Sequence, residues 1–333
     1  MVTTWNDDDI NLNDIADQTI AVIGYGIQGR AQALNMKDSN LDVIVGLKEG
    51  GPSWEIAVND KQKVFNVPEA VNAADIIHIL TPDMVQEEVY KNNISPNLEK
   101  GDAIGFSHGA AIQCNWISPP DWVDVIMLAP KGPGQRLREL YLDGFGIPAL
   151  VAVKNDYTGK AWNRVLALGK ATGCARPGLI KTDFKEEVET DWFGEQVDLC
   201  GGVDKLIRTS FEVLVESGYQ PEIAYFECLH ELKLIVDLIQ KYGISGMYRR
   251  VSETARYGGL TRGKRVLNES SKQSMLDTLA EIQSGKFASE WVNEYKTKGK
   301  NSFETHMNDL DNHTIEKVGK EMRRMMHPTE EIE

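Results

Sequence analysis

The sequence predicts two domains, an α/β domain followed by a domain built only from helices. Short apolar runs rich in Val and Ile alternate with helix-compatible stretches from residue 18 to about 181, which indicates an α/β sheet. Such runs are nearly absent beyond that point. A length of 333 residues suits about two domains. We therefore expect an α/β domain over 1–181 and an all-α domain over 182–333.

The composition, 41% hydrophobic and 26% charged residues, is that of a soluble globular protein. Its 36 basic and 50 acidic residues give a net charge of −14, which disfavours a nucleic-acid partner because such binders need a basic face. No apolar stretch approaches the ~20 residues of a membrane span, and the start, MVTTWNDDDI, lacks a signal-peptide pattern. We expect no membrane partner.

The four cysteines, Cys114, Cys174, Cys200 and Cys228, form no CxxC pair, which favours a reduced, cytoplasmic setting.

Six apolar runs predict the strands of the first domain. They are residues 19–23, 43–47, 76–80, 103–106, 123–128 and 149–153. Each lies near Gly, Pro or Asp, which are turn residues. Continuous apolar runs of this length, separated by helices, are typical of parallel strands buried on both faces of a sheet.

A glycine array follows the first run. Gly24, Gly26 and Gly29, with Tyr25, Ile27 and Gln28 between them, form a G-x-G-x-x-G motif between a predicted strand and a helix. The first glycine permits a tight turn, the second lets the backbone approach a pyrophosphate, and the third lets helix pack on strand. The phosphates would sit on free N–H groups at the helix N-terminus. The motif predicts a Rossmann-type dinucleotide-binding domain; the alternative is a glycine-rich turn without a ligand.

The end of the second run should contact the adenosine ribose. An acidic side chain there favours NAD, and a basic one favours the 2′-phosphate of NADP. Lys48 and Glu49 are adjacent, and Ser53 could also donate to a phosphate. Our hypothesis is NADP with appreciable use of NAD, although these side chains could instead point to water.

Polar residues follow three other runs, at the sheet edge where open α/β sheets bind ligands. They are Thr81, Pro82 and Asp83; His108, within Ser107-His108-Gly109; and Lys131, within residues 129–134 (APKGPG). The alternatives are a surface-loop histidine and an ordinary solvated lysine.

Helix signals and glycines divide the second domain. Asp183 and Glu186 predict a helix start, and the helical pattern runs to Cys200, where two glycines interrupt it. A second helix ends at Gly218, and a third runs from Pro221 to Gly243. Residues from about 326 to 333 read as a loose tail.

Two acidic pairs in these helices have helical spacing. Asp191 and Glu195 lie four apart in the first helix, and Glu227 and Glu231 in the third, so each pair shares a face. Glu227 falls within an apolar stripe formed by Ile223, Leu234 and Leu238. We expect it to be buried, and a buried charge needs a partner.

Divalent metals offer such a partner. Four carboxylates match the charge of two Mg²⁺ ions, and all-oxygen ligation suits magnesium or manganese. The alternative for the first pair is a solvated acidic face, because Glu187 and Asp198 share it.

Four segments together resemble ketol-acid reductoisomerase in its short, class I form. They are residues 24–29 (GYGIQG), 129–134 (APKGPG), 189–196 (ETDWFGEQ) and 225–233 (YFECLHELK). The resemblance extends from about residue 15 to 325. It implies a helical domain that is knotted and a homodimer, or a higher homo-oligomer, with shared active sites.

The resemblance also implies roles for individual residues. Asp191 would bridge two Mg²⁺ ions and Glu195 would bind one and take part in catalysis. Glu227 and Glu231 would come from a second subunit, Glu231 also facing substrate. Ser252, for which a helix cap is the simpler explanation, would contact the substrate carboxylate. The implied cofactor contacts are Gly24, Tyr25, Gly26, Ile27, Gln28, Gly29, Lys48, Ser53, Thr81, Pro82, Asp83 and Gly134; His108 and Lys131 would lie beside the reacting centre.

The chain departs from the family pattern in two places. Ala110 and Ala111 follow His108-Gly109 where a bulkier pair is usual, which bears on nearby cofactor contacts. Glu49 and Pro52 replace a pattern richer in serine and basic residues, which weakens the NADP assignment.

The implied reaction has two steps. A 2-aceto-2-hydroxy acid such as 2-acetolactate or 2-aceto-2-hydroxybutyrate undergoes a magnesium-dependent alkyl migration, and NADPH reduces the product to a 2,3-dihydroxy acid. The whole reaction belongs to valine, leucine and isoleucine biosynthesis. Two alternatives are a metal-free hydroxyacid dehydrogenase and a nucleotide-sensing module without activity.

Overall fold

The computed structural model describes residues 2–326, so the predicted C-terminal tail at 327–333 lies outside the described residues. The chain forms two compact units, which meet between Thr190 and Asp191. This junction falls within a helix, whereas the sequence places the domain boundary between 181 and 182. Each unit is described by itself.

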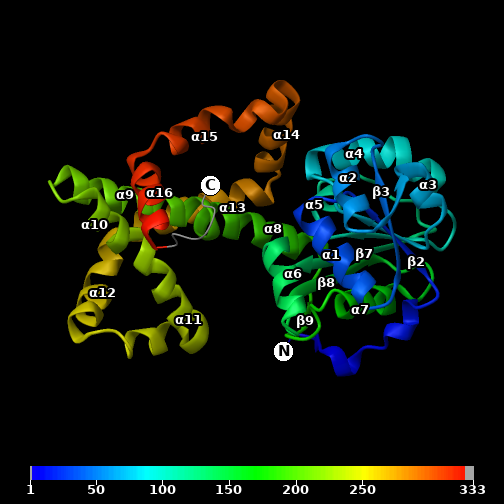
Figure 1. Ribbon diagram of the computed structural model, residues 1–333, viewed down its shortest axis with the longest axis horizontal. Coiled ribbons are helices and arrows are strands. Elements are labelled where there is room, and N and C mark those ends of the chain that lie inside the picture. The colour runs from blue at the N-terminus through cyan, green and yellow to red at the C-terminus, as the bar shows by residue number, and fades with distance from the viewer. Residues whose placement is uncertain (1, 327–333) are drawn as a thin grey trace. The chain divides into compact units, whose positions relative to one another are not determined.

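The first unit is built on a nine-stranded sheet with the order β1-β9-β8-β7-β6-β5-β2-β3-β4 (Figure 1). The strands are β1 (Thr4–Trp5), β2 (Thr19–Ile23), β3 (Asp42–Leu47), β4 (Lys63–Asn66), β5 (Ile76–Ile79), β6 (Ala103–Phe106), β7 (Asp124–Pro130), β8 (Ala149–Asn155) and β9 (Leu179–Lys181). The strands from β4 to β7 are all parallel, in the order of a Rossmann sheet. All six predicted runs form strands.

One strand prediction was wrong in direction. The run at 149–153 lies in β8, which pairs antiparallel with β7 rather than parallel. Helix α6 (Gly134–Leu142) lies between these two strands in the chain. Composition alone does not distinguish the two directions, because β8 is also largely buried.

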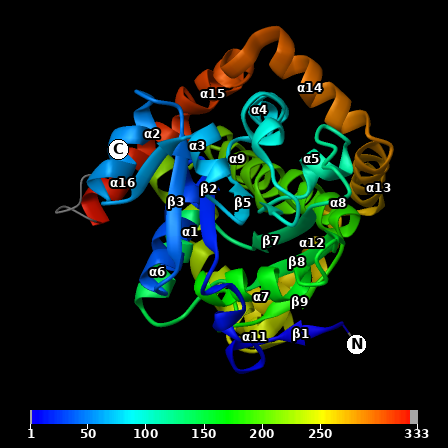
Figure 2. The same ribbon diagram turned by 90° about the vertical axis from the view of Figure 1, so that its right-hand side faces the viewer.

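Helices cover both faces of this sheet, as Figure 2 shows. The helices are α1 (Ile27–Asp38), α2 (Pro52–Asn59), α3 (Val67–Asn72), α4 (Asp83–Val89), α5 (Ala110–Gln113), α6 and α7 (Ala161–Ala171), with a π-helical turn, η3 (Tyr90–Ile94), after α4 and short 3-10 turns at Asp7–Asp9, Leu12–Ile15 and Ser95–Asn97. Side chains of α1, α6 and α7 form one apolar core with the sheet, and those of α3, η3 and α5 form the other. Both faces of the parallel strands are therefore buried.

Every element that the structure assigns in the described part of the second unit is helical, as predicted (Figure 1). The α-helices are α8 (Phe184–Gly194), which crosses the junction, α9 (Gly201–Glu216), α10 (Pro221–Tyr225), α11 (Glu231–Tyr248), α12 (Glu253–Val266), α13 (Glu269–Gln283), α14 (Lys286–Lys298), α15 (Glu304–Asp311) and α16 (Thr314–Met326). Two π-helical segments, η5 (Glu195–Leu199) and η6 (Phe226–His230), and a 3-10 turn, η7 (Gly299–Phe303), connect them.

Local signals explain the helix ends. The Asp183 carboxylate accepts a hydrogen bond from the Glu186 N–H (2.9 Å), which caps the start of α8 as predicted. Gly218 and Gly243 have positive φ angles of 91° and 72°, and they end the second predicted helix and break the third. These glycines end or break helices at the positions that the sequence predicted.

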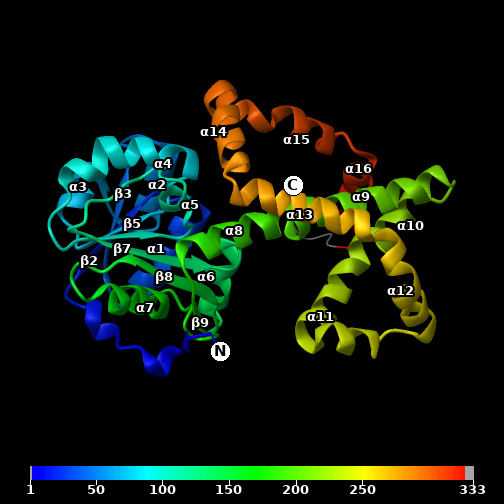
Figure 3. The same cartoon turned by 180° about the vertical axis from the view of Figure 1, so that it is seen from behind.

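The second unit leaves much apolar surface exposed. One buried apolar cluster contains Phe211, Ala224, Tyr225 and Ile315, from α9, α10 and α16. By contrast, Leu234 on α11 and Leu260 on α12 are 54% and 59% exposed. Figure 3 shows α11 and α12 projecting away from α9, α10 and α16 of the same unit. Exposed apolar faces of this kind are typical of interaction surfaces.

Candidate functional site

A different physical requirement explains each glycine of the loop between β2 and α1. Gly24 has a φ of 101°, and a Cβ atom there would lie 2.8 Å from the Leu80 carbonyl oxygen. A Cβ on Gly29 would lie 2.3 Å from the Gly24 carbonyl oxygen, so helix and strand can pack closely only at glycine. A Cβ on Gly26 would meet nothing within 4 Å. Gly26 is the N-cap of α1, so its open surroundings leave room for a phosphate at the helix N-terminus.

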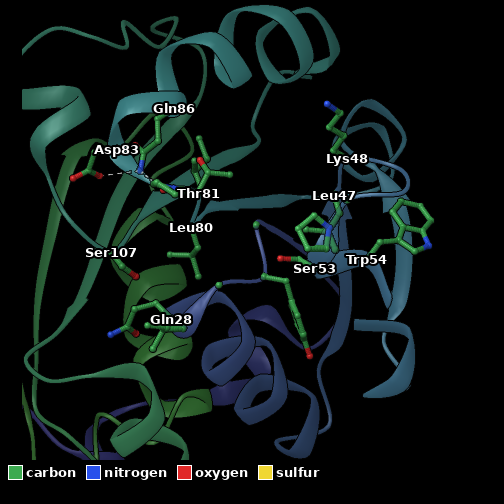
Figure 4. Close-up of a pocket in the computed structure, with 18 of the residues that line it drawn as sticks. Gln28, Leu47, Lys48, Ser53, Trp54, Leu80, Thr81, Asp83, Gln86 and Ser107 are labelled. Atoms are coloured by element: carbon green, nitrogen blue, oxygen red, sulfur yellow. Dashed lines mark hydrogen bonds between the residues drawn. The ribbon is translucent and has the colours of Figure 1, made fainter. Parts of the chain in front are cut away.

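A cavity of about 580 Å³ opens beside this loop (Figure 4). Most of the predicted cofactor contacts line it, namely Gly24, Tyr25, Gly26, Ile27, Gln28, Lys48, Ser53, Thr81, Pro82 and Asp83. His108 lines it as well. Gly29 does not line it and instead packs against the Gly24 carbonyl. Gly134 lies against α1, where a Cβ would approach the Ile27 carbonyl oxygen to 2.3 Å, and it lines a neighbouring cavity of about 850 Å³.

The predicted ribose end of the cavity is formed by the segment between β3 and α2. Pro52 is the first residue of α2, a position that proline suits, and it contributes no N–H. The Trp54 N–H donates to the Gly51 carbonyl (3.0 Å). Lys48 and Ser53 line the cavity at this helix end, where their side chains can donate hydrogen bonds. Figure 4 shows both residues on the wall opposite Gln28 and Ser107. Glu49 is not among the residues that line the cavity.

The segment after β5 holds an unsatisfied hydroxyl. The Gln86 side-chain amide donates to the Thr81 carbonyl (2.9 Å) and to Asp83 Oδ1 (3.2 Å), which fixes this turn. Thr81 Oγ1 is buried and has no hydrogen-bond partner among the described residues. An open glycine cradle and an orphaned buried hydroxyl beside one cavity fit a phosphate-bearing dinucleotide.

Glu187 of α8 joins the two predicted catalytic side chains. Lys131 Nζ donates to Glu187 Oε1 (2.7 Å), and His108 Nδ1 lies 3.1 Å from Glu187 Oε2. The Gly109 N–H also donates to Glu187 Oε2 (3.0 Å). Strands β6 and β7 are adjacent, so their carboxyl ends bring the loops of His108 and Lys131 together.

Glu187 is ionised in this environment. Its burial would raise the pKa, but the hydrogen bonds and charges of His108 and Lys131 outweigh burial and lower the pKa to about 2. The alternative of a solvated acidic face, offered for Asp191 and Glu195 because Glu187 and Asp198 share it, does not hold for Glu187, whose side chain is 1% exposed. Helix α8 turns this residue toward the sheet edge, where Lys131 and His108 compensate the cost of burying it.

The departure at Ala110 and Ala111 belongs to the core rather than to the cavity. Both are buried at the start of α5, and Ala111 packs in the same apolar core as Phe184 of α8. A Cβ on the preceding Gly109 would lie 3.0 Å from Val188 Cγ2. Small residues here let α8, and with it Glu187, approach the His108 loop.

Asp191 lies one turn after Glu187 on the same helix, and Glu195 begins the π-helical segment η5. Ligand atoms of His108, Glu187 and Asp191 all lie within 4.8 Å of one another. Among the residues that the structure describes, this is the one grouping of three or more possible ligands at that spacing. Its donors include two carboxylates, which suit a hard divalent cation.

The structure does not bury Glu227. Glu227 and Glu231 are both exposed, and Ile223 and Leu234 of the predicted stripe are 53% and 54% exposed. The π-helical segment η6 changes the helical phase between Ile223 and Leu234, so these residues do not follow one regular face. Within the described chain, the four predicted metal ligands form no single cluster.

Ser252 is the N-cap of α12, where its hydroxyl oxygen accepts a hydrogen bond from the Ala255 N–H (3.1 Å). This cap accounts for the serine without a substrate.

No helix among the described residues is long and apolar enough to cross a membrane.

Comparison with known proteins covers both units. A family described as "acetohydroxy acid isomeroreductase, NADPH-binding domain" matches residues 14–178, and "ketol-acid reductoisomerase, C-terminal domain" matches 184–328. A ketol-acid reductoisomerase (NADP(+)) of Nitrosopumilus maritimus is 64% identical over 98% of this chain and 99% of its own length. One from Methanopyrus kandleri is 56% identical over 98% of this chain and 99% of its own.

A solved structure also resembles the chain throughout. An NADH-preferring ketol-acid reductoisomerase from an uncultured archaean is 44% identical, with a TM-score of 0.94 over 97% of this chain and 99% of its own.

Proposed function

We propose that this chain, which belongs to the ketol-acid reductoisomerase family, converts 2-acetolactate or 2-aceto-2-hydroxybutyrate to a 2,3-dihydroxy acid. The chain is an oxidoreductase with an NADPH-binding domain. The proposed reaction is a magnesium-dependent alkyl migration followed by reduction, within branched-chain amino-acid biosynthesis. The observation that carries it is the joining of His108 and Lys131 through Glu187 beside the dinucleotide cavity.

The chain's own groups prepare the site for charge that develops on substrate oxygens. Glu187 is anionic and accepts a hydrogen bond from Lys131 Nζ at 2.7 Å, which fixes the Lys131 side chain beside His108. His108 is oriented by the same carboxylate through Nδ1. This arrangement can hold a proton at Lys131 Nζ next to an oxygen that gains charge during rearrangement or reduction.

Metal binding would fall to Asp191 and Glu195, with Glu227 and Glu231 from a second subunit. Bound magnesium would polarise the substrate ketone as a Lewis acid. The oxygen donors of α8 and η5 fit such ions. Glu231 and Ser252 would contact substrate, and Glu195 would also act in catalysis.

The proposed assembly is a homodimer, or a higher homo-oligomer, with shared sites. The exposed apolar side chains of α11 and α12 support it, because a second copy would cover them. The proposed location is the cytoplasm, supported by the four cysteines, all of which are free thiols.

For the cofactor we propose NADPH with appreciable use of NADH. Lys48 and Ser53 supply donors for a 2′-phosphate, whereas Pro52 removes one backbone donor from the same helix end. Initial rates with NADPH and NADH on 2-acetolactate test this. We expect turnover with both, faster with NADPH; failure of NADPH would contradict the proposal.

Consumption of NADPH with 2-acetolactate, with and without Mg²⁺, tests the reaction. We expect turnover that EDTA abolishes and Mg²⁺ restores. Turnover unchanged by EDTA would favour the metal-free hydroxyacid dehydrogenase. Lack of activity with every keto acid would favour a nucleotide-sensing module.

A further inference from the structure

A buried glutamine on α1 is the centre of a polar network beneath the cofactor cavity. The Gln32 side chain is fully buried, yet both of its polar atoms are used. Its Nε2 donates to Ser107 Oγ (2.9 Å) and to Gln28 Oε1 (3.2 Å), and its Oε1 lies 2.8 Å from His78 Nε2. Three separate segments of the chain therefore meet at one amide.

His78 of β5 determines which way this amide points. Burial lowers the pKa of His78 to about 4, so the imidazole is neutral at neutral pH. Because Gln32 Oε1 can only accept, the His78 Nε2 carries the proton and donates to it. Gly105 of β6 makes room for this ring, since a Cβ there would lie 2.6 Å from His78 Nδ1. The NH₂ group of Gln32 is thereby directed to Ser107 and Gln28.

Both arms of the network end at catalytic loops. Ser107 directly precedes His108, and Gln28 Nε2 donates to the carbonyl of Gly132 (2.9 Å), which directly follows Lys131. Gln28 itself lies in the first turn of α1, where the dinucleotide phosphates would bind. A displacement of about 1 Å in a positioning group can cost about 100-fold in rate.

A second buried amide on α1 makes a comparison possible. Asn35 is also fully buried; its Nδ2 donates to the Thr172 carbonyl (3.0 Å) and its Oδ1 accepts from Arg138 (2.8 Å). These bonds tie α1 to α6 and to the end of α7, and they do not involve the loops of His108 or Lys131. Asn35 thus has the burial and chemistry of Gln32 without its connections.

We propose that Gln32 is a positioning residue for the reaction. It fixes the positions of the His108 and Lys131 loops relative to the glycine loop that would bind the nicotinamide cofactor. This rests on the proposed function. Gln32 is fully buried and is not among the residues that line the cofactor cavity, so it acts through Ser107 and Gln28.

The test compares Gln32→Met with Asn35→Leu in the full-length protein. Both should lose similar stability, because each removes a buried amide with its bonds. Gln32→Met should lower kcat at saturating substrate about 10- to 100-fold, with the Kd for NADPH, measured by fluorescence titration, within about twofold of the parent value. Asn35→Leu should keep kcat within about twofold. Equal kcat losses in the two variants would overturn the proposal.

A double variant distinguishes positioning from general weakening. Residues that act through one another do not have independent effects. We therefore expect Ser107→Ala to reduce kcat further by less than about twofold in the Gln32→Met background, although it should cost more in the parent. Fully multiplicative losses would overturn the proposal. If Gln32→Met does not fold, Gln32→Asn replaces it in the same comparison with Ser107→Ala. This side chain is one methylene shorter, so its amide no longer reaches Ser107 and Gln28. An unaltered chain without activity on 2-acetolactate would instead refute the proposed function.

Discussion

At the scale of single residues, Glu187 carries the clearest chemical information. A carboxylate buried this deeply persists only because Lys131, His108 and the Gly109 N–H compensate it. The sequence contained a usable signal, since Glu187, Asp191 and Glu195 recur every four residues along one helical face. That spacing does not reveal which of the three is buried, because burial depends on the loops packed against α8.

Glu187→Gln should reduce turnover of 2-acetolactate by at least about 100-fold, because Lys131 and His108 lose the negative charge that holds them. Glu186→Gln is the matched control, since Glu186 is the exposed neighbour on the same helix. Steady-state kinetics on both variants check this. Comparable activity in the two would contradict the assigned role of Glu187.

His78 makes stability depend on pH. Its pKa is about 4 in the folded chain against an ordinary 6.5, so the unfolded state binds more protons between these values. The stability it contributes is present above 6.5 and is lost as the pH falls toward 4. Going from pH 7 to pH 5 should cost about 2 kcal/mol through His78.

Asp102 acts in the opposite direction in this window, because burial raises its pKa to about 6. The measurement is therefore the difference between the parent and His78→Leu in urea unfolding at pH 7 and pH 5. The variant should lose less stability on acidification. An identical loss in both chains would show that His78 is not the group responsible.

At the scale of elements, the sequence predicted six of the nine strands, among them all those that bear the cofactor and catalytic loops, because their apolar runs are long and unbroken. It missed β1, β4 and β9; β1 has only two residues. β4 is polar and only partly buried at the sheet edge, and β9 has three residues. It also missed the π-helical segments, because a residue pattern does not mark where a helix widens. The wrong prediction that Glu227 is buried follows from that omission.

The cavity was predicted more fully than the catalytic cluster. The glycine motif fixes backbone geometry locally, so the positions of Gly24 and Gly26 could be foreseen. Gln32 and Glu187 could not, because their roles depend on side chains from strands and loops distant in sequence.

The glycine loop allows two substitutions with opposite expectations. Gly26→Ala should fold with unaltered thermal stability, since its Cβ meets nothing within 4 Å, but it should weaken NADPH binding at least about tenfold by filling the phosphate seat. Gly24→Ala should destabilise the domain itself, because of its positive φ and the nearby Leu80 carbonyl. Thermal unfolding and NADPH titration separate the two effects, and equal behaviour of both variants would contradict this account of the loop.

At the scale of the whole molecule, we propose that each active site is formed by two chains. Asp191→Asn and Glu227→Gln should each be inactive alone. In co-expressed mixtures about a quarter of the activity should return, because half of the dimers are hybrids and each hybrid has one intact site. No recovery, with hybrids confirmed by differential tags, would mean that both acidic pairs act within one chain.

The position of a labelled methyl group in the product distinguishes rearrangement followed by reduction from reduction alone. 2-Acetolactate labelled with ¹³C in the methyl on C2 is incubated with the enzyme, Mg²⁺ and NADPH, and the product is followed by ¹³C NMR. We predict that the labelled methyl moves to C3 and gives 2,3-dihydroxy-3-methylbutyrate. Oxidation of NADPH with the label still on C2, giving 2,3-dihydroxy-2-methylbutyrate, would contradict the account, because that product arises by reduction without rearrangement.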